Sequence, residues 1–93
     1  MEYIIIEKFR NGDAKRVYER YFEKGRMAPS GLIYRESWVD KEMKMCFQIM
    51  ECQDIELIHD WIKNWQDIID FEIVPVITSE EAQKRVHKMI YNG

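Results

Sequence analysis

Residues 58–77, IHDWIKNWQDIIDFEIVPVI, join an amphipathic helix directly to a strand. Trp61 and Trp65 stand four positions apart on the apolar side of a helix that the periodicity predicts over residues 55–66. A strand is predicted over residues 69–77, where β-branched residues cluster. Neither element can bury its apolar surface alone, so the remainder of the chain must cover both.

Capping and turn residues mark the boundaries of this unit. Asp54 precedes the helix and is a good N-cap. Pro75 lacks an amide donor, which favours an edge position for its strand. Thr78 and Glu81 form a capping box that predicts a C-terminal helix over residues 79–91. The apolar side of that helix consists of Ala82, Val86, Met89 and Ile90.

The N-terminal half begins with a strand and a helix. The strand is predicted over residues 2–9, where β-branched residues again cluster. The helix is predicted over residues 14–24, with Asp13 as its N-cap and Gly25 at its end.

Two further strands are predicted over residues 32–39 and 43–51. Asp40-Lys41-Glu42 connects them and lacks the Asn-Gly of a tight two-residue turn, so a somewhat longer hairpin loop is expected. The complete order is βαββαβα, and its first six elements match the ferredoxin-like split βαβ arrangement. We therefore predict an α+β fold: a ferredoxin-like βαββαβ domain over residues 1–93, with a four-stranded antiparallel sheet and an added C-terminal helix.

Both faces of the predicted sheet carry apolar side chains, although a face that meets water is normally polar. In the third strand one face holds Met43, Met45, Phe47 and Ile49, and the other holds Cys46, Met50 and Cys52, interrupted by Gln48. In the second strand we expect Ile33 and Val39 on one face, and Leu32, Tyr34 and Trp38 on the other. Two helices can cover only one face. Either the helix over 79–91 or a second copy of the chain must cover the other, and a symmetric homodimer through the sheet face is the simpler solution.

The composition excludes several function classes. The 93 residues are 46% hydrophobic and 33% charged, with a net charge of -3, whereas proteins that bind nucleic acid usually carry a basic patch. No run of 18 apolar residues is present, so no membrane span is expected. The N-terminus lacks the basic flank of a signal peptide. A cytoplasmic protein without nucleic-acid or membrane partners is therefore expected.

No motif points to a metal or another cofactor, and we predict none. His59 and His87 fall on different predicted helices, and no Cys-x-x-Cys or His-x-x-x-His spacing occurs. Cys46 and Cys52 would lie roughly 20 Å apart if both belong to one extended strand. A disulfide spans about 7 Å at most, so free thiols are expected.

The loop over residues 25–31, GRMAPSG, has two glycines but not the lysine and hydroxyl residue of a phosphate-binding loop. Lys24 and Arg26 could hold an anion at its rim, and a merely solvated loop is the alternative.

Four glutamates fall within predicted strands: Glu7, Glu36, Glu51 and Glu72. A carboxylate in a sheet that is apolar on both sides is costly unless it is paired or hydrated. Several of them projecting into the uncovered face would mark a polar pocket with perturbed pKa values; strand ends and edge strands would explain them otherwise. Glu7 is the most informative because its strand is central in the predicted sheet.

Aromatic residues supply the remaining candidates. Trp61 and Trp65 are expected in the core, each indole finding one acceptor, while Trp38 and Tyr34 could line a ligand pocket. The predicted ligand-binding residues are Glu7, Tyr34, Glu36, Trp38, Gln48 and Glu72.

The segments IEKFRNGDAKRVYERYFEKGRMAPSGL, SWV, CFQIMECQD and WIKNWQDIIDFEIVPVITSEEA resemble the bacterial family known as domain of unknown function 3303. The resemblance covers residues 4 to about 83, and the blocks GRMAP, SWV, MEC and DFEIVPV are its most specific parts. It implies a ferredoxin-like fold of the dimeric α+β barrel group, which includes small monooxygenases and muconolactone isomerases, and it implies a homodimer. It implies no activity, and no histidine-based site of that group has a matching motif here.

Two functions remain open at this point. One is a homodimer with a small-molecule pocket, between the sheet and the helices or at the dimer interface, that binds a ligand or acts as a cofactor-free enzyme. The other is a non-catalytic protein-interaction or regulatory module. The fold alone cannot decide between them.

Overall fold

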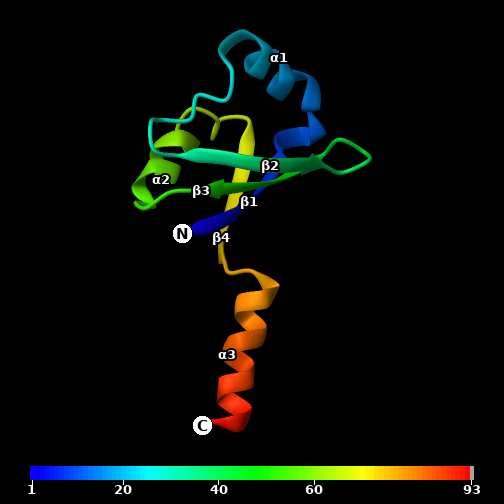
Figure 1. Ribbon diagram of the computed structural model, residues 1–93. Coiled ribbons are helices and arrows are strands. Elements are labelled where there is room, and N and C mark those ends of the chain that lie inside the picture. The colour runs from blue at the N-terminus through cyan, green and yellow to red at the C-terminus, as the bar shows by residue number, and fades with distance from the viewer. Residues whose placement is uncertain (93) are drawn as a thin grey trace.

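The computed structural model describes residues 1–92 as a four-stranded sheet with three α-helices (Figure 1). In chain order the elements are β1 (Glu2–Phe9), a 3-10 turn (Arg10–Gly12), α1 (Ala14–Lys24), β2 (Ile33–Val39), β3 (Met45–Glu51), α2 (Glu56–Ile62), β4 (Ile69–Val76) and α3 (Ser79–Tyr91). The predicted α+β class and the order of the elements are confirmed.

The strands lie in the order β2-β3-β1-β4, and every neighbouring pair is antiparallel. β1 and β3 are therefore central and β2 and β4 are edges, which is the ferredoxin-like arrangement. Pro75 lies opposite Tyr3 on the edge strand β4, as its missing amide donor predicted.

Two of the three predicted N-caps, Asp13 and Thr78, form with ordinary geometry. The Asp13 carboxylate accepts from the Arg16 amide at 3.1 Å, and the Thr78 hydroxyl accepts from the Glu81 amide at 3.1 Å. α1 ends at Gly25, whose φ of 70° is the left-handed conformation that favours glycine. Local side-chain chemistry therefore sets three of the helix ends.

The second helix is shorter than its periodicity predicted. α2 ends at Ile62, and the chain continues to Ile68 in tight turns. There the Asn64 amide donates to the Trp61 carbonyl, three residues back rather than four. Asp54 is not the N-cap, because Ile55 occupies that position, but its carboxylate accepts from the Glu56 amide at 3.0 Å. In these turns and at the end of α2, Trp65 and Trp61 both donate from their indole nitrogens to the Arg26 carbonyl.

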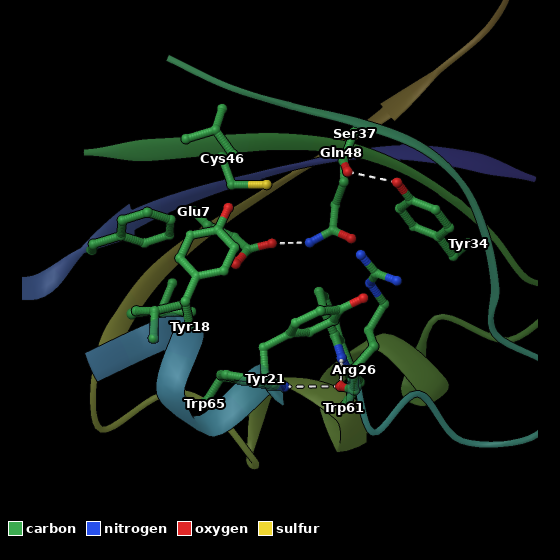
Figure 2. Close-up of a pocket in the computed structure, with 14 residues that line it drawn as sticks. Glu7, Tyr18, Tyr21, Arg26, Tyr34, Ser37, Cys46, Gln48, Trp61 and Trp65 are labelled. Atoms are coloured by element: carbon green, nitrogen blue, oxygen red, sulfur yellow. Dashed lines mark hydrogen bonds between the residues drawn. The ribbon is translucent and has the colours of Figure 1, made fainter. Parts of the chain in front are cut away.

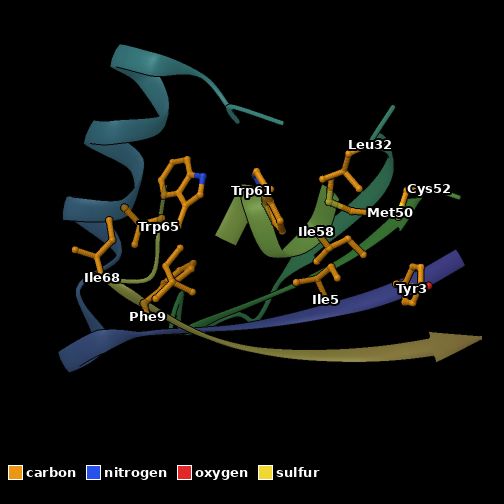
Figure 3. Close-up of a cluster of buried hydrophobic side chains, with 12 residues drawn as sticks. Tyr3, Ile5, Phe9, Leu32, Met50, Cys52, Ile58, Trp61, Trp65 and Ile68 are labelled. Atoms are coloured by element: carbon orange, nitrogen blue, oxygen red, sulfur yellow. The ribbon is translucent and has the colours of Figure 1, made fainter. Parts of the chain in front are cut away.

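The core lies between α1, α2 and one face of the sheet, which we call the helix face (Figure 3). Ile5, Met50, Ile58, Trp61 and Ile69 are fully buried there. Fully burying a large apolar side chain contributes about 1.5–3 kcal/mol relative to leaving it exposed. The anchoring role expected of the 58–77 stretch follows, since three of these five residues belong to it.

A bulge in β2 changes which of its side chains share a face. The pairing with β3 shifts between Tyr34 and Glu36, so that one extra residue enters β2. Tyr34, Ser37 and Val39 then pair with helix-face residues of β3, and Ile33, Glu36 and Trp38 pair with residues of the opposite face. The prediction that Ile33 and Val39 share one face, and Tyr34 and Trp38 the other, was wrong, because strict alternation does not survive a bulge.

The opposite side of the sheet, the open face, is covered by no helix of its own chain. Its apolar side chains are half-buried or exposed, and they are Ile4, Ile6, Ile33, Trp38, Met45, Phe47, Ile49, Val74 and Val76. α3 does not cover them: it extends away from the end of β4 and contains no buried residue (Figure 1). Intramolecular cover by this helix, one of the two sequence-based alternatives, is thereby overturned.

Candidate functional site

A cavity of about 270 Å³ lies between the helix face of the sheet, α1, the segment following it and the Trp61–Trp65 region (Figure 2). We call it the helix-side cavity. Its walls are mainly aromatic and aliphatic, and include Phe9, Val17, Tyr18, Trp61 and Trp65. Its polar side chains include Glu7 and Gln48 on the sheet side and Arg26 from the segment that follows α1. The polar and the apolar parts of the lining are therefore separate.

Two buried polar side chains form the sheet side of the cavity. Glu7 of β1 is 5% exposed and Gln48 of β3 is 4% exposed. The Gln48 amide nitrogen donates to the Glu7 carboxylate, and the Gln48 amide oxygen has no hydrogen-bond partner in the described residues. Figure 2 shows that oxygen turned toward the cavity. A buried acceptor without a donor costs about 1–3 kcal/mol.

The environment of Glu7 changes its acidity. Burial raises the pKa of Glu7 to about 7, while the positive charge of Arg26 opposes this rise. Both protonation states are then populated near neutral pH. A carboxyl group of this kind can accept and return a proton, as a general acid–base group does.

The neighbouring thiol is unsuited to nucleophilic chemistry. Burial, assisted by the Glu7 carboxylate, raises the pKa of Cys46 to about 12. The thiol form therefore predominates at neutral pH, whereas the thiolate is the reactive species. Cys46 and Cys52 are both free.

Arg26 stands at the exposed end of the cavity. Its guanidinium lies 3.7 Å from the centre of the Tyr34 ring and 5.5 Å from that of Tyr21. Its backbone carbonyl accepts from both Trp61 Nε1, at 2.9 Å, and Trp65 Nε1, at 3.0 Å. The two indoles thus share one acceptor and hold the loop that carries Arg26.

α1 is held over the cavity by an ion pair with the turns that follow α2. The Arg20 guanidinium donates to both Asp67 carboxylate oxygens, at 2.7 and 2.8 Å, and to the Asn64 carbonyl. The hydrogen bond from Arg20 lowers the pKa of Asp67 to about 2. The roof of the cavity is therefore fixed by a bidentate contact rather than by helix packing alone.

A family profile described as Domain of unknown function (DUF3303) matches residues 1–90 of the 93-residue chain. The chain belongs to the DUF3303 family. Comparisons with curated proteins and with solved structures return no significant match. Membership of DUF3303 thus agrees with the resemblance seen in the sequence and assigns no activity.

The six predicted site residues of this DUF3303 chain divide between the two faces of the sheet. Glu7, Tyr34 and Gln48 line the helix-side cavity. Glu36, Trp38 and Glu72 pair with residues of the open face and contribute nothing to the cavity. The sequence left open whether the strand glutamates project into the uncovered face; Glu7 does not, because β1 turns this residue toward the helices together with Tyr3, Ile5 and Phe9.

Several cavity residues were absent from the predicted set: Tyr18, Tyr21, Arg26, Ser37 and Cys46. Tyr18 and Tyr21 lie on the apolar side of α1, where core packing was the ordinary interpretation. Arg26 had been considered only as an anion contact on a solvated loop. The Tyr34 hydroxyl bonds Ser37 Oγ at 2.6 Å, a contact that the bulge in β2 makes accessible.

The described part of the chain shows neither a cluster of metal-binding side chains nor a membrane-spanning helix. Residues 1–92 contain no group of three histidine, cysteine, aspartate or glutamate side chains placed to hold a metal ion. His59 is an exposed residue that contacts Glu56 at 3.3 Å. Among the helices described, none combines the length and apolar character needed to cross a membrane.

Proposed function

We propose that this DUF3303 protein binds a small organic molecule in the helix-side cavity and works as a homodimer. The observation that carries the proposal is the unpartnered Gln48 amide oxygen, buried beside Glu7 in a largely aromatic cavity. Buried polar groups normally have partners. A ligand that donates to this oxygen supplies the missing one.

Stability alone is a poor explanation for this pair. Burying a carboxyl group and an amide next to an empty volume weakens a core, because the polar atoms lose water and the walls lose packing contacts. Ligand sites, in contrast, combine apolar walls with a few polar groups that orient the bound molecule. The helix-side cavity has this composition.

Proton transfer without a cofactor is the chemistry that Glu7 supports within this proposal. Its pKa of about 7 lets it act as base and as acid in the same cycle. Cys46 remains a thiol, so a covalent thiolate route is disfavoured. Glu7 is accordingly our candidate for the general acid–base residue.

A ligand screen tests the proposal. Trp61 and Trp65 border the cavity, so intrinsic fluorescence and melting temperature both report its occupation. We expect at least one small metabolite to raise the melting temperature and change the fluorescence of the wild type, and Glu7→Gln to weaken that response.

The matched control is Glu72→Gln, which makes the same chemical change on the open face. It should leave the response to the ligand intact. If no compound of a broad metabolite set shifts either signal, or if both variants weaken the response equally, the cavity is not a ligand site.

The dimer rests on two unpartnered apolar surfaces in the same chain. The open face presents Phe47, Ile6 and Ile49 at its centre, and the projecting α3 exposes Val86, Met89 and Ile90. Their charges are complementary, with carboxylates at Glu36 and Glu72 and basic side chains on the later turns of α3. A second copy supplies both surfaces at once, and a symmetric contact pairs them twice.

The solution mass measured by light scattering tests the dimer. We expect twice the chain mass for the wild type and the single mass for Val86→Glu. A wild-type monomer at concentrations well above micromolar would contradict this part of the proposal without touching the ligand site.

A non-catalytic interaction module is the second candidate, and the exposed apolar side of α3 favours it. A stable complex with a different protein that depends on Val86, together with no response in the ligand screen, would support this alternative over the first.

A further inference from the structure

The helix-side cavity contains an arginine, Arg26, that forms no salt bridge with any described residue. Among the residues described, Arg10, Arg20, Arg35 and Arg85 each pair with a carboxylate. Arg16 and Arg26 form no such ion pair, and of these two Arg26 is partly buried whereas Arg16 is exposed. Figure 2 shows its guanidinium turned toward Tyr34 and Gln48, which also line the cavity.

The surroundings of Arg26 fix the plane of its guanidinium. Tyr34 stacks on it at 3.7 Å, and Tyr21 lies at 5.5 Å. Stacking occupies the face of the group and leaves the N–H edges free. Those edges match the two oxygens of a carboxylate, which is the geometry of the strongest arginine contacts. The exposed end of the cavity is therefore prepared for an anion.

Next to Gln48 and Glu7, the cavity requires a ligand group that donates a hydrogen bond and carries no negative charge. The free Gln48 oxygen accepts hydrogen bonds and cannot donate them. The adjacent Glu7 carboxyl, when ionised, repels a second anion. A ligand that enters with its charge toward Arg26 must thus present an O–H or N–H group toward Gln48. The charge of Arg26 and the acceptor of Gln48 together define a single orientation for the ligand.

The walls between these ends select for a flat molecule. Phe9, Tyr18, Trp61 and Trp65 contribute aromatic surface, against which a planar ring packs with favourable dispersion. The volume of about 270 Å³ lies just below the range of about 300–1,000 Å³ of ligand pockets. One substituted ring is the appropriate size.

Building on the proposed function, we infer that the ligand is a small planar carboxylate carrying an O–H or N–H group. The carboxylate pairs with Arg26 at the exposed end, and the donor bonds the Gln48 amide oxygen at the buried end. Glu7, beside that donor, is placed to take its proton.

Three related probes test this inference with the full chain: 4-hydroxybenzoate, benzoate and phenol. Calorimetric titration and tryptophan fluorescence report binding. We expect 4-hydroxybenzoate to bind tightest, and the loss of either the carboxylate or the hydroxyl to weaken affinity about tenfold or more.

Two variants test whether Arg26 recognises the carboxylate and whether Gln48 recognises the hydroxyl. Arg26→Gln leaves the backbone carbonyl that holds the tryptophans, so the loop is retained. It should abolish the preference for 4-hydroxybenzoate over phenol, because only 4-hydroxybenzoate carries the carboxylate that Arg26 would bind. Gln48→Met, which conserves length, should abolish the preference over benzoate.

Equal affinity for phenol and 4-hydroxybenzoate, or an undiminished preference in Arg26→Gln, would overturn the inference while leaving the cavity a ligand site for other compounds. The proposed function fails separately, when no compound of the metabolite screen binds. If Gln48→Met does not fold, the comparison of the probes on the wild type and on Arg26→Gln still decides the matter.

Discussion

The two faces of the sheet are built from similar residues but hold them in different environments. On the helix face Glu7 is 5% exposed and its pKa is raised to about 7, whereas Glu72 of the adjacent β4 is exposed on the open face. Trp61 of α2, which packs against the helix face, is 2% exposed, whereas Trp38 of β2, on the open face, is 54% exposed. Glutamate and tryptophan are therefore buried on the helix face, where they line a cavity or form the core. On the open face the same residue types remain exposed, because the two helices cover only one face.

The largest expected effect follows from removing a tryptophan that packs against the helix face. Trp61→Ala deletes a buried ring and one of the two hydrogen bonds to the Arg26 carbonyl. We expect a loss of about 3–5 kcal/mol in the free energy of unfolding, measured by urea denaturation. Trp38→Ala should cost clearly less. Equal losses would mean that the open face is as well packed as the core.

The second effect is a dependence of the free energy of unfolding on pH that arises from Glu7. Burial raises its pKa from an ordinary 4.5 to about 7, so the folded chain binds more protons than the unfolded chain between these values. Wild-type stability should therefore fall as pH rises through this window, by about 3 kcal/mol in total. Below it both states are protonated, and the penalty is absent.

Glu7→Gln mimics the protonated carboxyl and should remove this decline. Denaturant unfolding at pH 5 and pH 8 checks it: the variant gains stability over the wild type at pH 8 and little at pH 5. A variant that loses stability equally at both pH values would show that the Glu7 carboxylate is needed for folding.

The third effect concerns the open face as a contact surface. Phe47 lies between Ile6 and Trp38 across the sheet. Phe47→Glu should raise the dissociation constant of the proposed dimer about 30-fold or more, equivalent to ~2 kcal/mol, as followed by sedimentation. Phe22→Glu, at a residue of α1 that is 79% exposed, is the matched control and should leave association unchanged. Dissociation by both variants would point to a general effect of charge instead.

The smallest effect is expected for the glutamate of the open face. Glu72→Gln should change the free energy of unfolding by no more than about 0.5 kcal/mol at either pH, as for ordinary surface substitutions. A larger, pH-dependent change would show that a partner buries Glu72 in solution. Repeating the measurement in the Phe47→Glu background would then restore the small value.

Residue patterns were sufficient for the local structure. Asp13 and Thr78 cap the helices that they were expected to cap, and Pro75 lies on an edge strand. These outcomes depend on the side chain and its nearest neighbours along the chain, so the order of elements and the ferredoxin-like arrangement followed directly.

The candidate site was only half predictable. Glu7 was singled out, yet its side of the sheet was not, because Tyr3, Ile4, Ile5 and Ile6 make both faces of β1 apolar and period-two alternation gives no signal. The bulge at Arg35 separated Tyr34 from Trp38, and nothing in the local sequence marks that extra residue.

What the sequence by itself determined about this DUF3303 protein is the set of strands and helices, their order, and the caps at Asp13 and Thr78, since these follow from interactions within a few residues. Tertiary structure alone decided that Glu7, Gln48 and Arg26 meet at one cavity and that α3 leaves the open face uncovered. Burial, pKa and the direction of a side chain depend on residues distant in sequence. The cavity and the raised pKa of Glu7 therefore exist only when β1, β3 and the Trp61–Trp65 segment are packed together.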